Sequence, residues 1–133
     1  LDCDLQEASI QALQGVQQMM RRLDILNQRL SVELHQPLRM GIGLHCGDAI
    51  VGQMGPPKTP IITALGDNVN IAARLEAMTK EFGAEVVVSA ETAAAADLDF
   101  SAYPHHDMDV RGRETQIGVY AVEDSKSIPV PAI

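Results

Sequence analysis

The first thirty residues contain the pattern that most limits the fold of this chain. Apolar residues recur there three or four positions apart, which is the period of one face of an α-helix. Glutamines and Arg21 occupy the other faces. We therefore expect a long amphipathic helix that packs an apolar stripe, methionines included, against a sheet. The stripe consists of Leu5, Ala8, Ala12, Val16, Met19, Leu23, Leu26 and Leu30.

The rest of the chain alternates short apolar runs with turn residues. Gly47 and Asp48 separate the first two of these runs, which we expect to pair as a β-hairpin. Asp67 or Asn68 is suited to cap the following helix. The order predicts an α+β domain with helices on one or both faces of a sheet. The expected segments are strands at 38–46, 49–54 and 61–65, a helix at 68–80, a strand at 85–89, a helix at 90–96, and strands at 106–110 and 116–122.

Size and charge narrow the classes of function. The chain has 133 residues, which suits one domain. Its net charge of −8 and its 3% of aromatic residues disfavour polynucleotide binding, which uses clustered basic groups and stacking rings. Cys3 and Cys46 match no zinc or redox spacing, and no apolar run reaches the about 18 residues that span a bilayer. We expect free thiols and no membrane insertion in a cytoplasmic segment, although its parent protein could be membrane-tethered.

The most informative stretch is LGDNVNIAARLE at residues 65–76. Asn70 and Arg74 are four positions apart, so they share one face of a helix. The Asn carboxamide can hydrogen-bond a sugar oxygen or water, and the Arg guanidinium is a permanently charged fork that suits a phosphate. The same spacing also fits a solvated polar face on which Arg74 pairs with Glu76 or Glu81.

This stretch resembles the second half of class III adenylate/guanylate cyclase catalytic domains. GIGLHCGDAIVGQMG before it, and EVVVS and VRGRETQIGVYAV after it, extend the resemblance from the first helix to Val122. The resemblance implies a ferredoxin-like α+β fold, an antiparallel sheet with flanking helices, truncated at its N-terminus. We expect the partial catalytic domain to cover residues 1–123, and residues 124–133 to form a disordered or frayed tail.

The resemblance also implies roles for individual side chains. Asn70 would position the ribose, and Arg74 would stabilise the phosphorus centre as the 3′-hydroxyl attacks it. Thr63 holds the purine-reading position, commonly Asp or Thr in adenylate cyclases and Cys in guanylate cyclases, which favours ATP over GTP. Arg113, with Arg111 as the second choice, would contact the distal phosphates. The alternatives are a β-branched strand residue for Thr63 and an ordinary surface residue for the arginine.

The two metal-binding aspartates of the family have no counterpart here. Asp2 and Asp4 lack the strand that precedes the first of them in the family, and the base-reading Lys is missing as well. The resemblance therefore implies Mg²⁺ or Mn²⁺ bound by residues outside this chain, or by the partner in a head-to-tail homodimer or complementary cyclase half. The pairs His45–Cys46 and His105–His106 do not suit a metal, because adjacent strand residues point to opposite faces.

Three functions follow from these observations. The first is an adenylate cyclase fragment that forms 3′,5′-cyclic AMP and diphosphate from ATP but is inactive, or nearly so, by itself. The second is a non-catalytic regulatory module that retains the cyclase fold and dimer surface. The third is an unrelated α+β ligand-binding domain with a chance match. Intact Asn70 and Arg74 favour the first over the second.

Overall fold

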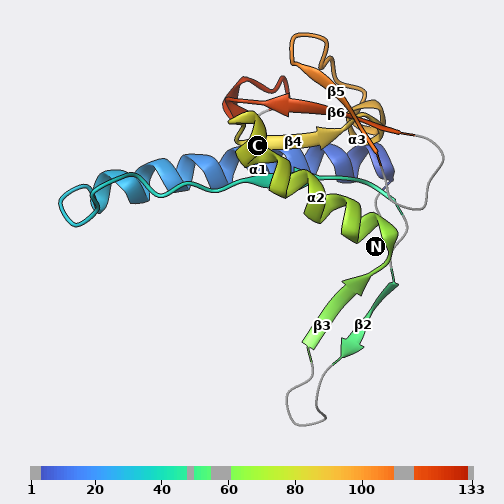
Figure 1. The fold of residues 1–133 in the computed structure, drawn as a ribbon, viewed down its shortest axis with the longest axis horizontal. Coiled ribbons are helices and arrows are strands. Elements are labelled where there is room, and N and C mark those ends of the chain that lie inside the picture. Colours follow the sequence, from blue (N-terminus) through green and yellow to red (C-terminus); the bar gives the residue numbers. More distant parts are fainter. Residues whose placement is uncertain (1–3, 48–49, 55–60, 110–115, 132–133) are drawn as a thin grey trace.

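The computed structural model describes residues 4–47, 50–54, 61–109 and 116–131. Four strands form one sheet in the order β1-β4-β6-β5, and β2 and β3 form a separate two-stranded sheet (Figure 1). The expected α+β class is confirmed, although the sheet is mixed, because β1 is parallel to β4 while the other pairs are antiparallel. The elements are α1 (Leu5–Arg29), β1 (Ile42–Leu44), β2 (Ile50–Met54), β3 (Ile61–Leu65), α2 (Asp67–Phe82), β4 (Val86–Ser89), α3 (Ala90–Ala96), β5 (His105–Met108), β6 (Ile117–Val122) and a 3-10 turn at Ser125–Ser127.

Helices cover both faces of the four-stranded sheet. Val86 and Val88 of β4 pack with Leu13 and Val16 of α1 and with α3. Val87 points to the opposite face and packs with Ile71 and other residues of α2. The alternation follows from the two-residue period of a strand, which sends successive side chains to opposite faces. The domain therefore has three layers, with α1 and α3 on one side and α2 on the other.

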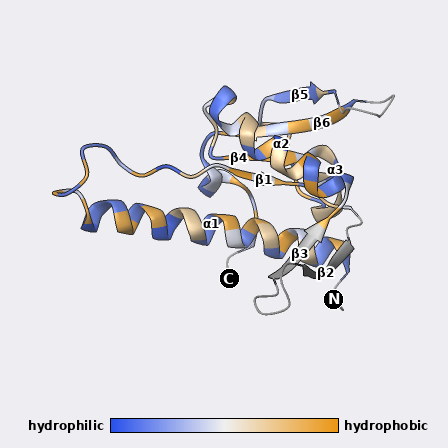
Figure 2. Ribbon diagram, turned by 60° about the horizontal axis from the view of Figure 1, so that its bottom comes forward, coloured by the Kyte–Doolittle hydropathy of each residue, from blue (hydrophilic) through white to orange (hydrophobic). Residues whose placement is uncertain are grey.

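The first helix forms as expected, but the face that it buries shares only Val16 with the predicted stripe. Leu5, Met19 and Leu26 of that stripe are 57%, 45% and 42% exposed. The prediction failed because apolar residues occur on more than one sector of this helix, as its alternating orange and blue segments show (Figure 2). The residues that α1 buries are Ser9, Leu13, Val16, Gln17 and Met20.

The C-terminal segment accounts for the buried glutamine. The Gln17 side chain donates to the carbonyl oxygens of Ser125 and Ile128 at 3.1 and 3.0 Å. A carboxylate oxygen of Glu85 accepts from the Ser125 backbone N–H at 2.8 Å, and Ile128 is only 3% exposed. The expectation of a disordered or frayed tail is therefore wrong for residues 124–131, because a buried polar side chain holds them against α1.

The expected hairpin between the first two strands is also replaced by a different pairing. Residues 42–44 of β1 pair with β4, and β2 pairs instead with β3. Glycine explains how β1 reaches its place, since a Cβ on Gly43 would overlap the α2 backbone at Ala72 and Glu76. The β2–β3 hairpin projects away from the sheet and leads into the N-terminus of α2 (Figure 1).

Candidate functional site

Helix α2 provides the centre of the candidate site. Its N-cap is Gly66 at φ 137°, a conformation that glycine adopts and other residues rarely do. No side chain makes the capping hydrogen bond, so the expected cap by Asp67 or Asn68 is not formed. At the other end Gly83 adopts the left-handed conformation typical of helix C-termini. The helix thus ends in the usual way but begins without the usual side-chain cap.

Asn70 and Arg74 lie on an exposed face of α2. Ile71 and Leu75, one position after each, are 2% and 0% exposed and face the sheet. The guanidinium of Arg74 donates through Nη1 to the carbonyl oxygen of Asp109 at 2.8 Å. This bond directs the positive charge toward the end of β5. Within residues 4–47, 50–54, 61–109 and 116–131, Arg74 forms no ion pair, so the alternative of a carboxylate partner is not observed there.

The ends of the β5–β6 connection meet beside Arg74. A carboxylate oxygen of Asp109 accepts from the Gln116 side chain at 2.8 Å, while the Asp109 carbonyl accepts from Arg74. Arg74 therefore lies at the edge from which the connecting segment leaves and to which it returns. Arg111 and Arg113, the predicted phosphate-contacting residues, lie in that segment and outside the described residues.

The predicted base-reading residue belongs to the strand that precedes α2. Thr63 lies on β3, opposite Gly52 of β2 in the antiparallel register. The strand ends at Leu65, directly before the N-cap Gly66 of α2. Backbone placement thus puts Thr63 and Asn70 on consecutive elements, and the role of the Thr63 side chain stays a prediction.

The histidines make contacts other than metal bonds. His106 stacks on Phe82, with ring centroids 4.2 Å apart, and His105 lies edge-on to Tyr120. The described part of the chain contains no group of three or more His, Cys, Asp or Glu residues placed to hold a metal. Asp4 is occupied as the N-cap of α1 and accepts from the Glu7 backbone at 2.7 Å. His105, His106 and Asp4 are therefore engaged in contacts of the fold itself.

One contact network at the start of α2 was not predicted from the sequence. His45 bridges the Asn68 amide oxygen at 3.0 Å and the Ser89 hydroxyl at 2.9 Å. The sequence indicates His45 only as an unsuitable metal ligand and Asn68 only as a candidate helix cap. No spacing signal points to the contact, because the partners are 23 and 44 residues away from His45.

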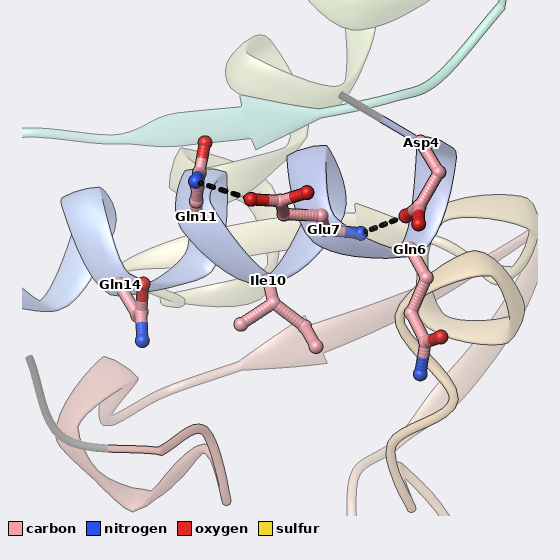
Figure 3. A pocket seen from close by; sticks show the side chains of 6 residues that line it. All are labelled: Asp4, Gln6, Glu7, Ile10, Gln11 and Gln14. Carbon is pink, nitrogen blue, oxygen red and sulfur yellow. Dashed lines mark hydrogen bonds between the residues drawn. The ribbon is translucent and has the colours of Figure 1, made fainter. Parts of the chain in front are cut away.

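Two hollows on the surface lie apart from Asn70 and Arg74. One, of about 320 Å³, follows the first turns of α1, and its lining side chains all come from that helix and its N-cap (Figure 3). It therefore lacks groups converging from several elements, as binding sites usually have. The other, of about 670 Å³, lies between the second half of α1, residues 37–41 and the second half of α2. Neither is lined by Asn70 or Arg74.

The fold and this face define a class of protein. It is a three-layer α+β domain that presents a carboxamide and a guanidinium, four residues apart, beside the end of a β-hairpin. Such a face suits an anionic ligand that carries hydroxyl groups. In the described residues no helix is both long and apolar enough to pass through a bilayer.

Comparison with known proteins identifies the family. The family model for the adenylate and guanylate cyclase catalytic domain matches residues 2–124. The chain therefore belongs to the adenylate and guanylate cyclase catalytic domain family.

Named relatives include three adenylate cyclases. Adenylate cyclase 1 of Rhizobium meliloti (strain 1021) is 33% identical over 101 residues, which is 76% of this chain and 15% of that protein. The terminal-differentiation specific adenylate cyclase of Dictyostelium discoideum is 28% identical over 92% of this chain and 6% of its own length. The adenylate cyclase of Anabaena cylindrica is 27% identical over 84% of this chain and 24% of its own length. The chain thus spans about a quarter or less of each.

Solved structures support the same fold. The guanylyl cyclase Cya2 superimposes with a TM-score of 0.70 at 24% identity, over 95% of this chain and 64% of its own. The adenylyl cyclase CyaB from P. aeruginosa gives a TM-score of 0.71 at 21% identity, over 96% of this chain and 63% of its own. The α+β arrangement of α1 to β6 is therefore the cyclase fold.

Proposed function

We propose that this chain is part of an adenylate cyclase catalytic domain that converts ATP to 3′,5′-cyclic AMP and diphosphate for intracellular signalling. The observation that carries the proposal is the shared exposed face of Asn70 and Arg74, with Arg74 directed toward the β5–β6 connection. The relatives named adenylate cyclase support ATP over GTP. Within the proposal Thr63 reads the adenine edge and Arg113 contacts the distal phosphates.

The proposed reaction is an intramolecular displacement at the α-phosphorus. The ribose 3′-oxygen forms a bond to that phosphorus, and the bond from the phosphorus to the oxygen that bridges it to the β-phosphate breaks. Diphosphate leaves with that oxygen, and the 3′-hydroxyl proton passes to water. The Asn70 carboxamide holds the ribose so that the attacking oxygen is aligned. The guanidinium of Arg74 stabilises the negative charge that grows on the phosphoryl oxygens and leaves its carbonyl partner on Asp109 to do so. Removal of such a group costs on the order of 100- to 1,000-fold in rate.

The proposal requires a partner. A head-to-tail homodimer, or a complementary cyclase half, would supply the aspartates that hold Mg²⁺ or Mn²⁺. The described residues contain no group of three or more His, Cys, Asp or Glu placed to hold a metal, and Asp4 is engaged as a helix cap. We therefore infer that the chain by itself is inactive or nearly so. We also propose that its location is cytoplasmic.

Complementation tests the proposal. The chain is mixed with a metal-competent cyclase domain whose own transition-state arginine has been removed, together with ATP and Mn²⁺, and cyclic AMP is measured by mass spectrometry. We expect product above that of either component alone. Arg74→Ala should remove it, and Arg21→Ala, a change at an exposed arginine of α1, should not.

The regulatory alternative predicts a different result. A module that keeps only the fold and dimer surface would bind the partner, as seen by sedimentation, without forming cyclic AMP. Binding without product would therefore reject the enzyme proposal in favour of the regulatory one. Product that persists with Arg74→Ala would reject the role given to Arg74.

A further inference from the structure

We propose that His45 and Asn68 are positioning residues that hold the first turn of α2, and with it Asn70, in place for the reaction. The inference rests on the proposed function for its catalytic consequence. The structural part stands on contacts among three elements: the end of β1, the start of α2 and the start of α3. None of these contacts involves Arg74 or the β5–β6 connection.

The histidine is the centre of the network. Its Nε2 lies 3.0 Å from the amide oxygen of Asn68, and its Nδ1 lies 2.9 Å from the hydroxyl of Ser89. Ser89 is fully buried, caps α3 by accepting from the Thr92 backbone at 3.2 Å, and shares a hydrogen bond of 2.8 Å with the Thr92 hydroxyl. One end of the network is thus fixed in the core, and its other end reaches α2.

These partners assign a tautomer to the ring. An amide oxygen can only accept, so Nε2 of the neutral imidazole must carry the hydrogen. Its Nδ1 is then an acceptor, and the Ser89 hydroxyl donates to it. The Ser89 oxygen still accepts from the Thr92 N–H. All the hydrogen-bonding groups named here are satisfied by this one arrangement, which favours a single orientation of the histidine.

The contact takes the place of a side-chain cap at the N-terminus of α2. Gly66 provides no side-chain cap, and the preceding β2–β3 hairpin projects away from the sheet (Figure 1). Glycine is an accepted N-cap residue, but it has no side chain to accept from the N–H groups of the first turn. The first fully packed residue of the helix is Ile71, at 2% exposed. Asn70 lies before that point, and its backbone N–H donates to the Gly66 carbonyl at 3.2 Å.

Gly47 also contacts the Asn68 side chain. A Cβ placed on Gly47 would overlap the Asn68 side chain, so the backbone after β1 lies directly against that side chain. The Asn68 carboxamide is therefore enclosed by His45 on one side and by the Gly47 backbone on another. Its place two residues before Asn70 means that a shift of Asn68 also shifts the carboxamide that acts on the ribose.

The first test measures the network without any enzyme activity. Nitrogen-15 NMR of the full chain should show His45 as the Nε2–H tautomer. In His45→Ala the amide of Asn70 should exchange with solvent at least about tenfold faster, while the amide of Thr79 in the same helix keeps its rate. The matched control is His35→Ala, because His35 is exposed and lies in the segment between α1 and β1. The Nδ1–H tautomer, or unchanged exchange at Asn70, would overturn the proposal.

The second test uses the complementation assay. Asn68→Ala should lower kcat by about 10- to 100-fold with little change in the KM for ATP, because a misplaced group loses transition-state contacts first. Asn68→Asp should restore most of the rate, since it keeps an oxygen acceptor for His45 and suits the first turn of a helix. Equal loss in both variants, or a rise in KM alone, would contradict positioning.

The two tests separate two kinds of failure. If the wild-type mixture forms no cyclic AMP, the proposed function fails while hydrogen exchange still decides whether His45 holds the first turn. If the wild type is active but Asn68→Ala is equally active, the proposed function survives and the positioning role is rejected. Where His45→Ala does not fold, the wild-type tautomer and the two Asn68 variants decide whether the positioning role stands.

Discussion

Replacement of Gly43 by alanine tests the packing that places α2 against the sheet. A Cβ at this position would lie 2.5 Å from the Ala72 carbonyl oxygen and 2.9 Å from the Leu75 carbonyl carbon, whereas ordinary contacts begin at 3.4 Å. These are backbone atoms of α2, so no side-chain rotation can relieve the overlap. The helix must therefore move away from β1 by about 1 Å, which also moves Asn70 and Arg74.

The size of the effect follows from two opposing contributions. Overpacking of this kind costs about 1–3 kcal/mol. Alanine in a strand is otherwise favoured over glycine by about 0.5–1 kcal/mol, because glycine loses more backbone freedom on folding. Because the overlapped atoms belong to the backbone, we expect the upper half of the overpacking range, so that Gly43→Ala lowers the free energy of unfolding by a net amount of about 1–2.5 kcal/mol. The urea midpoint should fall by about 0.5–1 M.

Urea unfolding followed by circular dichroism measures this change, with Gly15→Ala as the matched control. Gly15 lies inside α1 and a Cβ there meets no atom within 4 Å, so the same substitution should raise stability by about 0.5–1 kcal/mol. The two variants must therefore shift the midpoint in opposite directions. A Gly43→Ala protein as stable as the wild type would refute the close packing of β1 on α2.

Two further predictions concern the C-terminal segment. Gln17→Ala should destabilise the domain by about 1–3 kcal/mol in urea unfolding, because the Ser125 and Ile128 carbonyls lose a buried donor. The variant should also be cleaved faster by proteases after residue 123. An unchanged urea midpoint would contradict this role of Gln17. A hydrogen bond and Coulomb attraction from Asp24 raise the pKa of Lys126 above its ordinary 10.5. The stability from this pair is therefore present below pH 10.5 and is lost as the pH rises through the raised pKa. The difference in urea midpoint between wild type and Lys126→Gln should stay constant from about pH 6 to pH 9 and vanish at pH values above the raised pKa. A difference that grows with pH would contradict the pairing of Lys126 with Asp24 as its source.

Local patterns in the sequence were sufficient for most elements of the fold. The short helix at residues 90–96 and the strands around β4, β5 and β6 lie where hydrophobic patterns and turn residues predicted them. These signals depend on neighbours within a few residues of each other. The pairing of β1 with β4 was not predictable in this way. The two strands are separated in the sequence by β2, β3 and α2, and their pairing depends on how α2 packs against the sheet.

The buried face of α1 illustrates a second limit. Several sectors of that helix are apolar enough to pack, and the chosen one is decided by the sheet and by the C-terminal segment. Gln17 is polar, yet it is buried because two carbonyls more than a hundred residues away accept from it. A polar residue can occupy a core position when distant partners satisfy it, and a local pattern does not contain those partners.

The candidate site also has one part that the sequence predicted and one part that required the folded structure. The shared face of Asn70 and Arg74 followed from their spacing, and the family resemblance implied their chemistry. The direction of Arg74 toward Asp109, 35 residues away, and the contact of His45 with Asn68 required the folded structure. The roles of Thr63 and Arg113 stay predictions that substitution in the complementation assay can decide.

We propose that this chain supplies the transition-state half of an adenylate cyclase site. This claim is tested most directly by the rate of cyclic AMP formation in a mixture of the chain with a metal-competent, arginine-deficient partner, compared between wild type and Arg74→Ala. We predict a clear rate for the wild type and a loss of on the order of 100-fold or more for the variant. A mixture whose partners bind each other but form no cyclic AMP, or form it equally well without Arg74, would contradict the claim.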